Sequence, residues 1–183
     1  MGTQLMLHKR QLQQQTAIAT SVQHLMFHLN GETFATSIQS IREIIEYQVM
    51  TRIPLTPECL KGVINLRGAV VPVLDLSARL GGNPTQIGKR TCIVIVDVQV
   101  NEQYFHIGVV VDGVTEVLDV EPDKLETPPN FGLGLRSDFI AGMINQKDHF
   151  IVVLDMDCVL SAQELESLVE MASDSSPSKI AAV

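Results

Sequence analysis

The sequence lacks tryptophan, has few other aromatic residues and holds an odd number of cysteines. Its 183 residues include no Trp, two Tyr, six Phe and three Cys. The cysteines, Cys59, Cys92 and Cys158, form no CxxC pair, which disfavours a disulfide framework in so short a chain and predicts three reduced thiols. Cys92 and Cys158 have apolar neighbours in the sequence, so we expect both side chains to be buried as small hydrophobic groups.

Long apolar runs and basic clusters are also missing. No stretch reaches the roughly 18 apolar residues of a membrane-spanning helix, and glutamines interrupt residues 1–22, which therefore do not resemble a signal peptide. Lys and Arg number 13 against 21 Asp and Glu, which gives a formal net charge of −8. Because nucleic-acid phosphates repel such a chain, nucleic-acid binding is disfavoured. We expect a cytoplasmic protein without direct membrane insertion.

The common signatures of catalysis are absent from the sequence. There is no GxxxxGK[ST] phosphate loop and no GxSxG nucleophile motif. His24 and His28 share a strand face, but no third metal ligand is near them in sequence, which favours edge histidines over a zinc site. Asp75 and Asp155 each follow a strand, where a cap or turn is favoured over a catalytic carboxylate pair. We therefore predict no enzymatic activity, no cofactor and no metal.

The residues that are present predict an all-β fold. Val and Ile dominate the apolar positions, and such branched side chains suit strands. Asn30-Gly31 is typical of a type I′ hairpin turn because both residues tolerate a positive φ. A helical turn is expected near 122–125, and a terminal amphipathic helix over about 158–172, after the capping-box sequence Ser161-Ala162-Gln163-Glu164. Strands are expected at 25–29, 33–38, 41–46, 60–66, 70–76, 91–98, 104–111, 114–120, 139–145 and 150–156.

An internal repeat divides the chain into two similar halves. A shift of eighty positions aligns Gly62 with Gly142, Ile64 with Ile144, Asn65 with Asn145, and Val73-Leu74-Asp75 with Val153-Leu154-Asp155. Upstream, at a smaller offset, Glu43 aligns with Glu116, and we align Phe34 with Phe105. Five short strands per half predict two small closed barrels, since closure removes exposed strand edges. We expect the barrels to pack together and leave a groove between them.

The expected organisation has five parts. Residues 1–22 are a flexible extension and 173–183 a disordered tail. Between them, the first barrel spans about 23–86, the second about 87–156, and the terminal helix about 158–172. The helix is expected to cover a barrel, with partner binding as the alternative.

Arg67 and Glu43 are the charged residues most open to a role in binding. Arg67 leaves an apolar strand at a predicted turn, and its guanidinium can grip a carboxylate in a bidentate contact. Glu43 lies in the otherwise apolar stretch around Ile41, Ile44 and Ile45. Two alternatives are open: the pair forms an intramolecular contact, or one or both side chains bind a partner.

These segments resemble the CheW family of chemotaxis coupling proteins. The resemblance covers about residues 23–165 and is carried by the following stretches: Ile41-Arg42-Glu43-Ile44-Ile45, Thr51-Arg52-Ile53-Pro54, Gly62-Val63-Ile64-Asn65-Leu66-Arg67-Gly68 with the strand that follows, and Val109-Val110-Val111-Asp112-Gly113-Val114. It implies two SH3-like five-stranded β-barrels related by duplication, without enzymatic activity. It also implies an adaptor that joins the cytoplasmic tip of a methyl-accepting chemoreceptor to the regulatory domain of the histidine kinase CheA at membrane-bound receptor arrays.

The resemblance also implies two sets of binding residues. The kinase contact is expected at Val49 and Ile53. The receptor contact, in the groove between the barrels, is expected at Ile41, Glu43, Ile44, Asn65, Arg67, Gly68 and Val114. Alternative functions are a CheW-like adaptor of a pilus or surface-sensing system, or a small-ligand binder that uses the groove.

Overall fold

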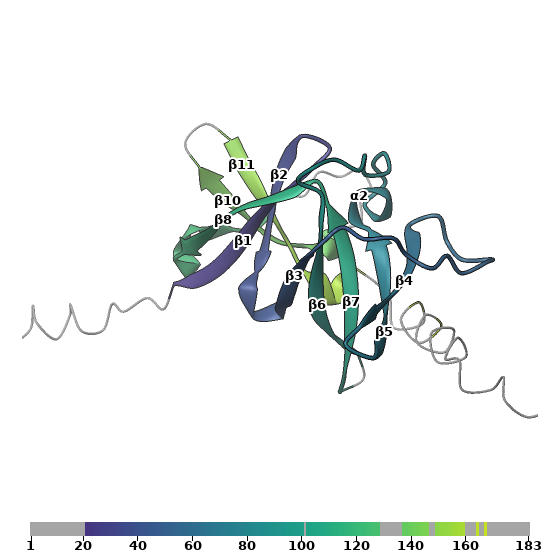
Figure 1. Ribbon diagram of the computed structural model, residues 1–183. Helices are drawn as coiled ribbons and strands as arrows, with labels where there is room; N and C mark the ends of the chain where they lie inside the picture. Colours follow the sequence, from purple (N-terminus) through teal and green to yellow (C-terminus); the bar gives the residue numbers. More distant parts are fainter. Residues whose placement is uncertain are drawn as a thin grey trace, which may run out of the picture.

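The computed structural model describes residues 21–100, 102–128, 137–146, 149–159, 164 and 167. Its strands form two sheets that lie side by side (Figure 1). The first sheet has the order β8-β1-β2-β11-β10-β9 and is called the β1 barrel below. The second has the order β3-β6-β7-β5-β4 and is called the β3 barrel.

Both halves of the chain contain a hairpin, an edge strand and a second hairpin that ends in a helical turn, and the second half adds η2, β9 and η3. The first half comprises β1 (Val22–Leu29), β2 (Glu32–Ser37), η1 (Ile38–Ser40), β3 (Ile41–Glu46), β4 (Leu60–Leu66), β5 (Ala69–Asp75) and α2 (Leu76–Arg79). The second comprises β6 (Cys92–Val100), β7 (Gln103–Val111), β8 (Gly113–Val120), η2 (Pro122–Lys124), β9 (Leu125–Glu126), η3 (Ser137–Phe139), β10 (Ile140–Gln146), β11 (His149–Leu154) and η4 (Met156–Cys158). The predicted strands and the helical turn near residue 122 are confirmed.

Strand register confirms the duplication. Gly62 pairs with Val73 across β4 and β5, and Gly142 pairs with Val153 across β10 and β11, so the eighty-residue offset relates equivalent positions. The register shifts next to the glycine in both hairpins. The two copies therefore repeat not only their strands but also their irregularity.

The leading hairpins follow an offset of 73 positions, which matches the expected alignment of Glu43 with Glu116 but not that of Phe34 with Phe105. Val73 pairs with Gly108 in β7, whereas Val153 pairs with Ala35 in β2. Ala35 and Gly108 are thus equivalent, 73 positions apart, as are Glu43 and Glu116. The alignment of Phe34 with Phe105 is wrong by two positions.

The predicted barrel boundaries, 23–86 and 87–156, are wrong because the halves exchange hairpins. Parallel pairing of β11 with β2 brings the β1–β2 hairpin into a barrel with β8 to β11. Parallel pairing of β5 with β7 brings β6 and β7 into a barrel with β3, β4 and β5. A repeat identifies which elements recur, but it does not identify the copy with which each strand pairs. Neither barrel is therefore one continuous stretch of chain.

The buried side chains form three clusters that match this arrangement. One fills the β1 barrel around Met26 and Ile151, and another fills the β3 barrel around Ile93 and Val110. The largest lies between the barrels and includes alternate residues of β1, β6 and β7, such as Leu25, Phe27 and Val94. The exchanged hairpins thus contribute one face to a barrel interior and the other to the joint core. Burial of this joint core holds the barrels together.

Glycine recurs at 62 and 142 because another backbone or side chain comes close at each position. A Cβ on Gly62, whose φ is +144°, would lie 2.4 Å from the carbonyl oxygen of Thr51. Thr51 exchanges two backbone hydrogen bonds with Val63, which extends the sheet beyond β4. At the equivalent position, a Cβ on Gly142 would lie 2.6 Å from Leu125 of β9, which pairs with β10.

The hairpin turn after β1 and the two ends of the chain were also predicted from the sequence. Asn30 and Gly31 have φ values of 49° and 83° between β1 and β2, which confirms the predicted turn. Residues 1–20, the tail 173–183 and almost all of the expected helix 158–172 lie outside the described residues, so these predictions stay untested. Within the described part of the chain, no helix is long and apolar enough to cross a membrane.

Candidate partner-binding surfaces

The edge strand β3 turns two apolar candidate residues towards the joint core. Ile41 pairs with Val96 and Ile44 with Val94, and paired residues of antiparallel strands point to the same face of a sheet. Val94 and Val96 belong to the joint core. Ile41 packs against that core, whereas Ile44 is 42% exposed. The predicted residues Ile41 and Ile44 therefore share the inter-barrel face.

The edge strand β8 presents the equivalent residues of the second half. Val114 pairs with Phe27 and Val117 with Leu25, and both partners belong to the joint core. Val114 is 37% exposed and Val117 is 49% exposed. By the 73-residue offset, Val114 is the repeat equivalent of Ile41, and Val117 is the repeat equivalent of Ile44. The edge patch is defined below as Ile41, Ile44, Val114 and Val117.

Val117 is a candidate residue that the sequence analysis missed. The signal was available, because the offset that relates Glu43 to Glu116 also relates Ile44 to Val117. What the sequence did not indicate was that β3 and β8 are edge strands of different barrels that border one joint core.

The charged candidates lie on the other face of β3. Glu43 pairs with Ile95, whose side chain fills the β3 barrel. Its carboxylate accepts a 2.9 Å hydrogen bond from Nη2 of Arg67, which leaves the β4–β5 turn. The intramolecular contact, one of the two alternatives, is therefore present. The Arg67 side chain is nevertheless 77% exposed, so the contact does not bury it.

Asn65 and Gly68 build the turn that carries Arg67. Arg67 and Gly68 both have positive φ, 52° and 92°, as a two-residue hairpin of type I′ requires. The Asn65 side-chain oxygen accepts a hydrogen bond from the backbone N–H of Gly68 at 2.8 Å. Their geometry thus positions the guanidinium at the end of the β3 barrel, next to edge strand β3.

The residues expected to contact the kinase lie on the connection between β3 and β4. Val49 is 96% exposed, whereas Ile53 is partly buried. On the same connection, Leu55 is fully exposed and has a φ of 62°. A leucine is rarely found in this left-handed conformation. The structure thus brings Ile41, Ile44 and Val114 to the inter-barrel face and places Val49 on a separate loop.

Comparisons with known proteins identify the family. Residues 23–164 match the model of the CheW-like domain. The chain belongs to the CheW family. It is 30% identical over 141 residues to the chemotaxis protein CheW of Klebsiella aerogenes, an alignment that covers 77% of this chain and 82% of that protein. Members of this family are adaptors in chemotaxis rather than enzymes, and this chain shares that role.

A solved structure and a partial relative extend the comparison. The scaffolding protein TtCheW from Thermoanaerobacter tengcongensis superposes with a TM-score of 0.69 at 29% identity, covering 79% of this chain and 97% of that one. This likeness confirms two SH3-like barrels. Protein PilI of Pseudomonas aeruginosa is 27% identical over 71 residues, which cover 39% of this chain and 40% of PilI.

In this CheW-family chain, the paired aspartates cap helical turns. Asp75 caps α2 and Asp155 caps η4. The fully buried Asp75 accepts hydrogen bonds from Thr85 N, Thr85 Oγ1 and Ala78 N, and lies 3.3 Å from Nζ of Lys61. These contacts match the predicted capping role rather than acid–base catalysis.

The histidines and cysteines also have structural surroundings. His24 Nδ1 lies 2.9 Å from the carbonyl oxygen of Val22, and the part of the chain that the structure describes holds no group of three or more potential metal ligands. Burial raises the pKa of Cys92, which keeps this thiol protonated at neutral pH. The prediction that Cys158 is buried is wrong: it is exposed, because η4 places it beyond the last strand.

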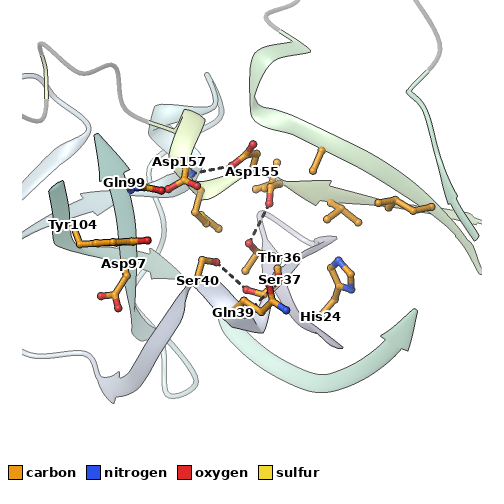
Figure 2. Close-up of a pocket in the computed structure, with 15 residues that line it drawn as sticks. His24, Thr36, Ser37, Gln39, Ser40, Asp97, Gln99, Tyr104, Asp155 and Asp157 are labelled. Atoms are coloured by element: carbon orange, nitrogen blue, oxygen red, sulfur yellow. Dashed lines mark hydrogen bonds between the residues drawn. The ribbon is translucent and has the colours of Figure 1, made fainter. Parts of the chain in front are cut away.

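A polar pocket lies between the barrels (Figure 2), and its lining includes none of the predicted binding residues. Its volume is about 390 Å³, and its walls come from η1, from η4 and from strands of both barrels, among them β2 and β11 on one side and β6 and β7 on the other. Asp97 faces His106 Nδ1 at 2.6 Å and Arg42 at 3.7 Å, and Asp157 accepts a hydrogen bond from the backbone of Gln99. Asp155, the third carboxylate of the lining, caps η4, so all three are engaged within the protein.

Proposed function

We propose that this chain couples the cytoplasmic tips of methyl-accepting chemoreceptors to the regulatory domain of a CheA-type histidine kinase. In this proposal the protein is cytoplasmic and is recruited to membrane-bound receptor arrays. The observation that carries the proposal is the edge patch, in which apolar side chains of two edge strands lie over one joint core.

The chemistry of the edge patch suits a helical partner. A receptor tip is a helical hairpin, and an amphipathic helix binds through a few apolar anchors supplemented by polar contacts. Ile44, Val114 and Val117 supply exposed apolar surface. Arg67, beside the same edge strand, adds a cation that remains largely exposed and suits a partner carboxylate.

The kinase contact is assigned to the β3–β4 connection, with Val49 and Ile53 as its residues. This loop belongs to the β3 barrel, whereas the edge patch spans both barrels. The two surfaces share no residue, so one chain can hold both partners at once. The protein then acts as a rigid bridge. A change of receptor state reaches the kinase as a difference in binding free energy between states.

A titration of a receptor-tip fragment tests the receptor contact. Ile44→Asp and Val117→Asp each place a charge in the edge patch and should weaken binding by about tenfold or more. The matched control is Tyr104→Asp, since Tyr104 is 67% exposed but lines the polar pocket. Unchanged affinity of both patch variants, or loss only with Tyr104→Asp, would contradict the assignment.

The pilus alternative rests on a partial match alone, and no feature of the described surfaces favours it. The discriminating measurement is which receptor and kinase copurify with the chain. Copurification with a pilus-associated receptor would reassign the pathway while leaving the adaptor mechanism unchanged.

A further inference from the structure

The turn between β1 and β2 joins three segments of the chain. The backbone N–H of Asn30 donates a 2.6 Å hydrogen bond to Oδ2 of Asp112. Its side-chain Nδ2 donates to the hydroxyl of Ser77 and, at 3.0 Å, to the carbonyl oxygen of Asn83. One residue of an exposed hairpin turn thus makes three hydrogen bonds to residues distant in sequence.

These three contacts connect the two barrels. Asn30 belongs to the β1 barrel, whereas Ser77 lies on α2 and Asn83 on the connection that follows, both attached to the β3 barrel. Asp112 lies between β7 and β8, where the chain passes from the β3 barrel into the β1 barrel. The backbone N–H of Asp112 also donates to the carbonyl oxygen of His28 at 2.9 Å. The crossing point is therefore tied to the end of β1 and to the first residue of the turn.

The surroundings of the Asn30 amide are tightly packed. Ser77 is buried, and its hydroxyl donates to the carbonyl oxygen of Asn83 at 2.8 Å. A Cβ on Gly82 would lie 2.8 Å from that hydroxyl oxygen and 3.2 Å from Nδ2 of Asn30. Asn30 has a φ of 49°, which asparagine tolerates, so the turn holds the Asn30 side chain in one orientation towards Ser77 and Asn83.

We propose that Asn30 is a positioning residue that fixes the relative orientation of the barrels and the start of β8. The inference rests on the proposed function, because it assigns a purpose to the edge patch. Half of that patch, Ile41 and Ile44, lies on the β3 barrel, and the other half begins with Val114, two residues after Asp112. Rotation of one barrel would change the spacing of the halves, so a helix that contacts both needs the orientation held.

The test compares Asn30→Gly with Asn83→Ala. Glycine tolerates the positive φ and keeps the N–H to Asp112, but removes both side-chain donors. Asn83 contributes its backbone carbonyl to this network, so the alanine variant keeps the acceptor and should bind receptor like the wild type. If Asn30→Gly fails to fold, Asn30→Asp carries the test, since it retains the turn preference and replaces the donor by an acceptor.

Two affinities separate positioning from general destabilisation. Asn30→Gly should weaken binding of a receptor-tip fragment by about tenfold, equivalent to about 1.4 kcal/mol. Its affinity for the kinase regulatory domain should stay within about twofold, because distant sites behave independently and the kinase loop lies on one barrel. Wild-type receptor affinity in a folded Asn30 variant, or equal loss for both partners, would overturn the inference.

Hydrogen exchange without any partner keeps this inference separate from the proposed function. Asn30→Gly should accelerate amide exchange over 112–117 and leave β10 and β11 unchanged. Unaltered exchange over 112–117 would overturn the positioning role. Failure of the wild type to bind a receptor fragment would instead overturn the proposed function.

Discussion

Replacing either repeated glycine by alanine gives a matched pair of perturbations with different expected costs. In Gly62→Ala the new Cβ would lie 2.4 Å from the Thr51 carbonyl oxygen and 2.9 Å from its carbonyl carbon. Two backbone hydrogen bonds between Thr51 and Val63, at 2.8 and 3.0 Å, hold that segment in place. The collision therefore requires backbone movement at the point where the sheet extends beyond β4.

The expected cost for Gly62→Ala has two parts. Overpacking against a fixed group costs about 1–3 kcal/mol, and a side chain at the φ of +144° adds about 1–3 kcal/mol. The free energy of unfolding should fall by about 4 kcal/mol. In Gly142→Ala the contact at 2.6 Å is with the Leu125 side chain, which can change rotamer, and Gly142 has no positive φ. Its cost should be about 1–2 kcal/mol.

Urea unfolding followed by far-UV circular dichroism measures both free energies, since the chain has no tryptophan to report by fluorescence. Each variant should shift one cooperative transition, because the exchanged hairpins make each barrel depend on the other half of the chain. Two separate transitions would show that the barrels unfold independently, and a larger loss for Gly142→Ala than for Gly62→Ala would show that the Thr51 contact does not set the cost.

Four further variants test individual residues. Arg67→Ala should weaken receptor-fragment binding by roughly tenfold. Its free energy of unfolding, measured by urea titration, should fall by less than about 1 kcal/mol, because the ion pair with Glu43 is exposed. A folded variant that binds the receptor fragment normally would disprove the role of Arg67. Leu55→Asn should raise that free energy by about 0.5–1 kcal/mol, since asparagine tolerates the positive φ of this exposed position; a lower melting temperature would contradict this. Asp75→Asn should lower the free energy of unfolding by about 3 kcal/mol, because Lys61 loses a buried counter-charge. This loss should exceed that of Asp155→Asn. The reverse order of the two variants in thermal unfolding would show that burial of the carboxylate does not set the cost.

Local chemistry accounts for what could be predicted from the sequence. Asn30-Gly31 specified its turn, and Asp75 and Asp155 were identified as caps, because each signal depends on a few neighbouring residues. Gly62 and Gly142 revealed the repeat because a neighbouring segment approaches both closely, Thr51 at the first and Leu125 at the second. Resemblance to the CheW family supplied the binding assignments, which stay predictions.

The exchange of hairpins could not be predicted in this way. It depends on parallel pairing between β5 and β7 and between β11 and β2, which joins strands that are distant in the sequence. The same limit explains why Val117 was missed, since its role depends on which strands form edges around the joint core. Cys158 was misplaced because apolar neighbours in sequence do not ensure burial beyond the last strand.

The proposed function requires one chain to hold receptor and kinase simultaneously through separate surfaces. The direct measurement is recruitment of a CheA-type regulatory domain to vesicles that carry receptor-tip fragments, with and without this protein. The kinase domain should be recruited only when the wild-type chain is present. The Ile44→Asp variant should still bind the kinase domain but stay off the vesicles. The Val49→Asp variant should reach the vesicles but leave the kinase domain in solution. Absence of recruitment by the wild type, or loss of both contacts in each variant, would contradict simultaneous binding through separate surfaces.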